Sequence, residues 1–156
     1  MKSKILVVDD DLEIRRSLHK VLRAEGYEVL LAEDGLVGLD MFDPAQTDLL
    51  LLDLNLPGKC GWDVVERITS VSPLLPIIVI TGQPNQCEMA TAAGVGALMG
   101  KPLDVPFLLK TITELLDEPV EQRLERLVGR PNHLRLSPRG LSDESSTLSP
   151  AKSKAR

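Results

Sequence analysis

Short apolar runs alternate with amphipathic stretches along the first 116 residues of the chain. The runs consist mostly of Val, Ile and Leu, which is typical of strands that are buried on both faces of a parallel sheet. Strands are therefore predicted at residues 4–8, 27–32, 48–52, 76–80 and 97–99.

The stretches between these runs carry apolar residues at helical spacing. In the first of them Leu18, Val21 and Leu22 share one face, Asp11 is a candidate N-cap, and Gly26 follows as a stop signal. Helices are predicted within residues 11–26, 34–42, 61–70, 85–94 and 104–116.

Five strand–helix pairs in succession predict an α/β fold. Right-handed crossovers produce a doubly wound, five-stranded parallel sheet with helices on both faces, and the order 2-1-3-4-5 is a common one for such sheets. Ligands of these folds bind in the crevice outside the carboxyl ends of the strands, where the strand order reverses.

Acidic residues stand at that reversal point in the predicted order. Asp9 and Asp10 follow the first strand, and Asp53 follows the third. A single acid at a strand end is commonly a turn or cap residue, but two acidic clusters on neighbouring strands favour a site. Converging carboxylates repel one another unless a cation joins them, and Mg²⁺ is the cation that such oxygen ligands suit.

Two further strand ends reach the same crevice. Thr81 ends the fourth strand and Lys101 follows the fifth. Taken alone, the threonine is most often a β-branched strand residue and the lysine a solvated surface charge. Together with the acids they supply what phosphoryl transfer to a carboxylate requires, namely a nucleophile, a divalent metal, a hydroxyl and an ammonium group.

The segments ILVVDDD, LLLLDLNLPGKCG, IVITG and LMGKP, in this order and spacing, resemble the receiver domain of two-component response regulators. The resemblance covers about residues 3–118. It implies that Asp53 is the phosphoacceptor. It also implies that Asp10 and Asp53 ligate Mg²⁺ directly, that Asp9 assists through water, and that the backbone carbonyl of Asn55 is a third protein ligand.

The same resemblance assigns the switch residues. It implies that Thr81 binds a phosphoryl oxygen and moves inward on activation, and that Lys101 pairs with the phosphoryl group. Leu98 stands where the family commonly has Tyr or Phe. Leucine has no ring to rotate, so the usual aromatic switch is not expected at this position.

The resemblance also implies partners. A sensor histidine kinase or a histidine phosphotransfer protein would donate the phosphoryl group. Since no effector domain follows in this sequence, output is expected through a separate protein, onward transfer, or a phosphorylation-dependent homodimer using the face of the fourth helix, fifth strand and fifth helix.

Two other functions stay open from the residues. A Mg²⁺-dependent phosphohydrolase uses the same chemistry, although Leu54 and Asn55 after Asp53 offer no additional acid as general base. The other is a receiver-like interaction domain that is never phosphorylated, which the joint presence of the five polar site residues disfavours. We expect a signalling domain that is not an enzyme acting on external substrates.

The remaining sequence adds a tail and a compartment. Residues 1–118 are predicted as the receiver domain, 119–129 as one short amphipathic helix, and 130–156, rich in Ser, Pro and charge, as a disordered tail. The formal net charge of -5 argues against direct nucleic-acid binding. The N-terminus is neither a signal peptide nor a membrane span, so a cytoplasmic protein is expected.

Overall fold

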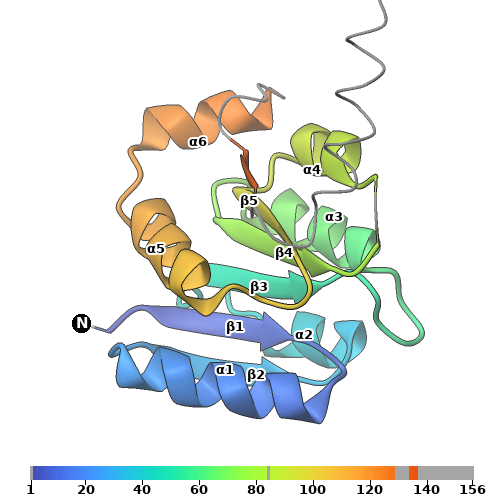
Figure 1. Ribbon diagram of the computed structural model, residues 1–156. Helices are drawn as coiled ribbons and strands as arrows, with labels where there is room; N and C mark the ends of the chain where they lie inside the picture. The colour runs from blue at the N-terminus through green and yellow to red at the C-terminus, as the bar shows by residue number, and fades with distance from the viewer. Residues whose placement is uncertain (1, 84, 129–133, 137–156) are drawn as a thin grey trace, which may run out of the picture.

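The computed structural model describes residues 2–83, 85–128 and 134–136. Its centre is a parallel sheet in the order β2-β1-β3-β4-β5-β6 (Figure 1). The strands are β1 (Lys4–Val8), β2 (Glu28–Ala32), β3 (Leu49–Asp53), β4 (Ile77–Thr81), β5 (Ala97–Gly100) and β6 (Arg135–Leu136).

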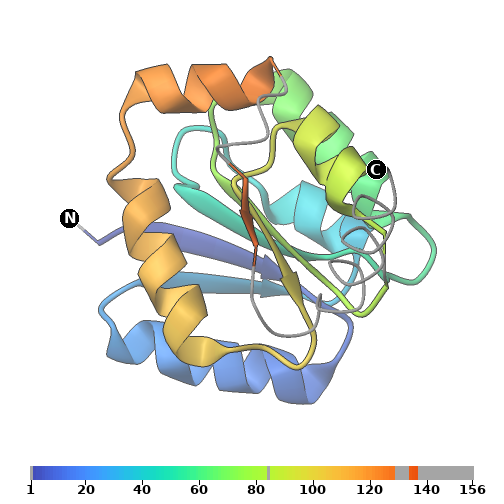
Figure 2. The same ribbon diagram turned by 45° about the horizontal axis from the view of Figure 1, so that its top comes forward.

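Helices cover both faces of this sheet (Figure 2). The helices are α1 (Leu12–Ala24), α2 (Gly35–Met41), α3 (Gly61–Val71), α4 (Cys87–Ala93), α5 (Val105–Leu116) and α6 (Val120–Leu127). Leu18 of α1 and Leu108 of α5 pack into one buried cluster with alternate strand residues, whereas Val64 of α3 and Ala90 of α4 belong to the cluster on the opposite face. The β3 and β4 residues are all buried, as expected for strands with a helix layer on each side.

Local sequence signals fix where the helices begin. The Asp11 carboxylate accepts the backbone N–H groups of Glu13 and Ile14 and so caps α1. Asp104 caps α5 in the same way through the N–H of Phe107, and Pro106 lies in the first turn of that helix. Each strand therefore passes into its helix within a short loop, and these loops form the edge of the sheet where the acids lie.

The predicted five-strand order is confirmed, and the structure adds a sixth strand at the β5 edge. β6 falls within residues 130–156, the stretch predicted as a disordered tail, of which the structure describes only 134–136. The rest of that stretch lies outside the described residues. α6 lies within residues 119–129, where one short helix was predicted. Within the described part of the chain, no helix combines the length and apolar character needed to cross a membrane.

Candidate functional site

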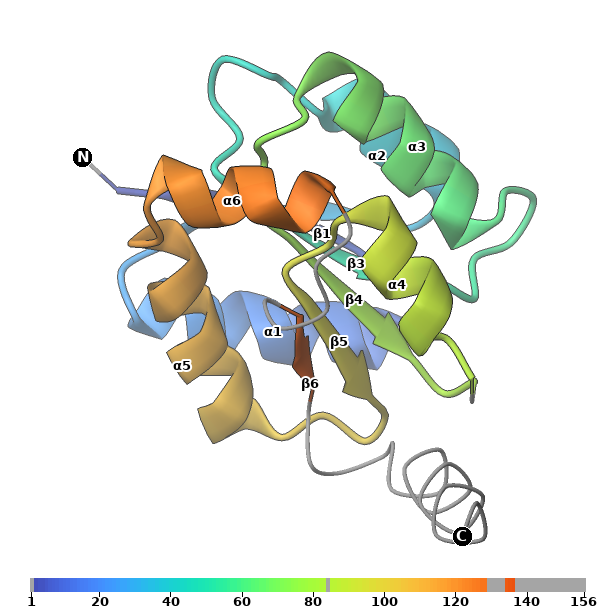
Figure 3. The same cartoon turned by 90° about the horizontal axis from the view of Figure 1, so that it is seen from above.

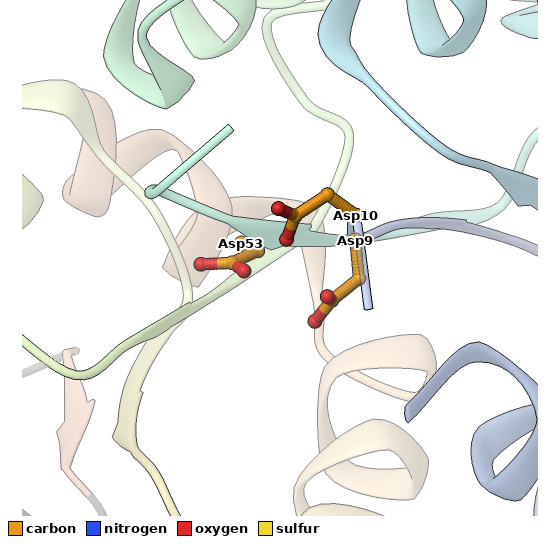
Figure 4. Close-up of side chains that lie close together, drawn as sticks. All are labelled: Asp9, Asp10 and Asp53. Atoms are coloured by element: carbon orange, nitrogen blue, oxygen red, sulfur yellow. The ribbon is translucent and has the colours of Figure 1, made fainter. Parts of the chain in front are cut away.

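Three carboxylates converge at the carboxyl ends of β1 and β3. These strands are neighbours, with Val8 paired to Leu52, so the residues that follow them share one edge of the sheet. Ligand oxygens of Asp9, Asp10 and Asp53 all lie within 4.8 Å of one another (Figure 4). The structure thus brings together the three acids that the sequence placed at this edge.

The three acids differ in burial. The side chains of Asp9 and Asp53 are each only 1% exposed, whereas Asp10 is exposed. Burying carboxylates this completely requires compensating contacts. Asp9 Oδ1 accepts the backbone N–H of Asp11 at 2.8 Å, but no hydrogen-bond donor reaches its buried Oδ2 from the described residues.

Asp53 has partners on both of its oxygens. Its Oδ1 accepts the backbone N–H of Asn55 at 3.0 Å, and its Oδ2 accepts Lys101 Nζ at 2.9 Å. The same ammonium lies 3.6 Å from Asp9 Oδ2. Lys101 follows β5 directly, and its peptide bond to Pro102 is cis. One cation therefore stands between two buried anions.

These contacts shift pKa values in opposite directions at the two kinds of group. Burial is the main cause that raises the pKa of Asp9; the charges of Asp53 and Asp10 add to it, while the Asp11 N–H and Lys101 oppose it. Burial alone would lower the pKa of Lys101, but the hydrogen bond and charge of Asp53, with the charge of Asp9, outweigh it and raise that pKa. The site holds more negative charge than its one ammonium compensates.

Thr81 reaches the same edge through strand pairing. It is the last residue of β4, is fully buried, and pairs with Gly100, the residue before Lys101. Its Oγ1 accepts the backbone N–H of Gln83 at 2.8 Å, which orients the hydroxyl at the start of the following loop.

The other two predicted residues lie differently. Asn55 is exposed, and it contacts Asp53 through its backbone N–H, whereas the prediction concerned its carbonyl. Leu98 is buried within β5, pairs with Val79 on one side and Leu136 of β6 on the other, and belongs to the apolar core.

Two residues of the site were not singled out from the sequence. Arg15 of α1 donates from Nη1 to the backbone carbonyl of Asp9 at 2.7 Å. Gly61 opens α3 so close to the Asp53–Leu54 backbone that an added Cβ would stand 2.6 Å from the Leu54 Cα. The sequence gives no signal for either, because a close approach or a guanidinium–carbonyl contact leaves no periodic pattern.

The donor set fits a magnesium ion. Mg²⁺ takes oxygen ligands, including one or two carboxylates. Here three carboxylates lie together, and the buried Asp9 Oδ2 lacks a hydrogen-bond donor among the described residues. A cation in this crevice would relieve the same repulsion that raises the pKa of Asp9.

A groove borders the site on the α1 side. It has a volume of about 270 Å³ and runs between α1 and the loop from β5 to α5, with Ile14, Leu18, Lys101, Pro102 and Leu103 among its lining residues. Its walls are mainly apolar, and Lys101 joins it to the acidic crevice.

Comparison with known proteins now defines the class. The response regulator receiver domain family matches residues 5–113, and the chain belongs to this family. It is the receiver domain of a two-component response regulator. The family is a signalling family whose members work with histidine kinases.

Particular relatives agree with this assignment. The response regulator MprA of Mycobacterium bovis is 36% identical over 141 residues, covering 88% of this chain and 61% of its own length. MprA of Mycobacterium avium is 37% identical, covering 72% of this chain and 50% of its own length. The chain thus spans less than two thirds of these relatives.

Solved structures extend the likeness to the fold. A CheY-like receiver domain protein of Methanospirillum hungatei is 33% identical with a TM-score of 0.73, covering 78% of this chain and 98% of its own. The response regulator TrrA of Thermotoga maritima, solved in complex with Mg²⁺ and beryllofluoride, is 32% identical with a TM-score of 0.67 and covers 74% of this chain and 99% of its own.

Proposed function

We propose that Asp53 accepts a phosphoryl group from a phosphohistidine and that the modified domain changes its binding to a protein partner. One Asp53 carboxylate oxygen forms a bond to phosphorus while the bond from phosphorus to the donor imidazole nitrogen breaks. The electron pair of that broken bond stays on the imidazole nitrogen. The observation that carries the proposal is the buried Asp53 carboxylate held at the edge of the sheet beside Lys101 and two further acids.

We assign the magnesium ligands as Asp10 and Asp53 directly, Asp9 through water, and the backbone carbonyl of Asn55. Support comes from the convergence of the three carboxylates and from the unpartnered, buried Asp9 Oδ2. When bound, the ion neutralises charge on the carboxylates and on the phosphoryl oxygens, which is the main requirement of phosphoryl transfer.

Lys101 and Thr81 bind the transferred group in this proposal. The Lys101 ammonium, at 2.9 Å from Asp53 Oδ2, exchanges its carboxylate contact for a phosphoryl oxygen. The Thr81 hydroxyl moves from the Gln83 N–H side of its loop toward another phosphoryl oxygen. The added charge thereby changes the loop between β4 and α4 and the faces beside it.

The phosphoryl donor is a sensor histidine kinase or a histidine phosphotransfer protein. The apolar groove between α1 and the β5–α5 loop is a suitable docking surface, because it opens beside Lys101 and therefore beside Asp53. We expect the exchange to take place in the cytoplasm. The domain catalyses only its own phosphorylation and dephosphorylation, and its output passes through a protein partner or a homodimer rather than through nucleic acid.

One experiment separates this function from its alternatives. The full chain is incubated with Mg²⁺ and acetyl phosphate, and its intact mass and amide shifts are followed, with Asp53→Asn as the control. We expect one labile phosphoryl group that is absent from the variant and from samples with a metal chelator. Multiple turnover of an external phosphate ester would instead indicate a phosphohydrolase, and no modification at saturating Mg²⁺ would indicate a binding domain that is never phosphorylated.

A further inference from the structure

The outer edge of β5 is occupied by the chain's own β6. Ala97 pairs with Arg135 and Leu98 with Leu136, and the Arg135 N–H donates to the Gly96 carbonyl oxygen at 3.1 Å. Figure 2 shows this short strand lying along β5. An edge strand without such a neighbour presents open N–H and C=O groups and pairs readily with another chain.

α6 bridges the helices on either side of that edge. Figure 3 shows it running from the end of α5 to the end of α4. At the α5 end, Arg123 Nη2 donates to the Leu115 carbonyl oxygen at 3.1 Å. At the α4 end, the backbone approaches so closely that a Cβ on Gly94 would stand 3.3 Å from the Arg126 carbonyl oxygen.

One buried carboxylate ties α6 and β6 to the end of α5. The Glu118 side chain is 1% exposed, and its Oε2 accepts Arg126 Nη1 and lies 3.5 Å from Arg135 Nη1. Arg123 Nε lies 3.9 Å from its Oε1. Arg135 also reaches Glu114 of α5 at 3.2 Å. Removing the Glu118 charge would leave a buried guanidinium group without its anion.

The apolar side chains of α6 contribute less to this attachment than its charges do. Val120 is 51% exposed, Leu124 is 50% exposed and Val128 is 72% exposed, whereas the side chain of Arg126 is 4% exposed. An amphipathic helix usually buries its apolar stripe. The attachment therefore depends strongly on the ion pairs of Glu118 and on the pairing of β6 with β5.

We propose that residues 118–128 and 134–136, here called the cover, are an autoinhibitory segment that prevents a second copy of this chain from pairing with the β5 edge. When the cover opens, two β5 edges can pair about a two-fold axis, an arrangement in which each copy offers the same surface. The inference concerns the chain without a phosphoryl group, so it does not depend on the proposed phosphoryl transfer.

The test uses the full chain without Mg²⁺ or a phosphoryl donor. Glu118→Gln removes the central charge, and Arg135→Pro removes both the β6 donor and its ion pairs without touching the core. Glu121→Gln, an exposed position on the same helix, is the matched control. Hydrogen exchange of residues 95–100 is measured at low concentration, and molar mass by light scattering over a concentration series.

We expect wild type and Glu121→Gln to stay monomeric with slow exchange in β5. Both opening variants should exchange residues 95–100 at least about tenfold faster, with β1 and β3 still protected, and should become dimers as concentration rises. Protection of β1 and β3 distinguishes an open cover from an unfolded domain. Unchanged β5 exchange in both variants, fast exchange without a dimer, or a wild type that is already a dimer would each overturn the proposal. Should Glu118→Gln fail to fold, the surface variant Arg135→Pro still decides.

Discussion

Gly61→Ala tests whether close backbone packing sets the position of the proposed phosphoacceptor. Gly61 is the first residue of α3, and its N–H donates to the Leu54 carbonyl oxygen at 3.2 Å. A Cβ at this position would stand 2.6 Å from the Leu54 Cα and 3.0 Å from the Asp53 carbonyl oxygen. Both are backbone atoms, so no side-chain rotation can relieve the contact.

The size of the displacement follows from these distances. The 2.6 Å contact falls about 0.8 Å short of the 3.4 Å at which ordinary packing begins, and a densely packed interior has little room to absorb the difference. We expect overpacking to lower the free energy of unfolding by about 1–3 kcal/mol. A shift of this order at Asp53 should slow phosphorylation by about tenfold to a hundredfold, because reaction rates fall steeply when a reacting group is misplaced by about 1 Å.

The assay is the rate of phosphorylation by acetyl phosphate and Mg²⁺, read from intact mass well below the melting temperature. Gly96→Ala is the matched control, because its Cβ would stand 2.7 Å from Leu115 Cδ2, a terminal methyl group far from the acids that can rotate away. The control should lose some stability but keep its phosphorylation rate. A wild-type rate in Gly61→Ala, or an equal loss in Gly96→Ala, would refute the reasoning.

Three further outcomes are expected. Asp9→Asn should raise the unfolding free energy of the metal-free chain by about 0.5–2 kcal/mol at neutral pH. Burial, with the two neighbouring aspartates, raises the pKa of Asp9, so the wild type loses stability as the pH rises from 3.8, its unfolded value, through the raised folded value. Denaturant titrations over a pH series should show the gain vanish below 3.8 and shrink when Mg²⁺ is added; equal stability at neutral pH would contradict this origin. Leu98→Tyr should unfold more easily by about 1–3 kcal/mol, because the site is fully buried, yet still be phosphorylated, and loss of phosphorylation in a folded variant would count against it. Trp62 is the single tryptophan and donates to Gln86 Oε1 at 2.9 Å, so its fluorescence should change when beryllofluoride and Mg²⁺ bind; an unchanged spectrum despite shifted amides would show that the β4–α4 loop does not move.

The strands and the acidic crevice could be predicted from the sequence because both follow from local pattern. A strand buried on both faces is a continuous apolar run, and the polar residue that ends it must lie at the edge of the sheet. The run from Leu49 to Leu52 followed by Asp53 is the clearest case, and strand pairing brings this residue beside Asp9. The convergence then follows from the strand order alone.

Other features depend on tertiary contacts that leave no pattern. β6 has two residues, Arg135 and Leu136, too few to show any alternation, and it forms because the β5 edge is available. Gly61 is one of 11 glycines, and only the structure shows that its missing side chain makes room for the Asp53–Leu54 backbone. A sequence shows where the chain can turn but not which turn a functional loop packs against.

The orientation of α6 is the point at which charge overrides periodicity. Its apolar residues recur at helical spacing, and the pattern alone predicts that this stripe faces the protein. The structure instead buries Arg126 against Glu118, an acid at the end of α5 that is itself 1% exposed. Turning the helix over would bury a few apolar side chains, each worth about 1.5–3 kcal/mol when fully buried. It would also separate a buried ion pair, at about 3–5 kcal/mol for the uncompensated charge, and take the Arg123 guanidinium from the carbonyl groups that end α5. The two terms are of similar size, so the contacts of Arg123 with the α5 carbonyls decide the orientation, and a single charge change at Glu118 is enough to alter it.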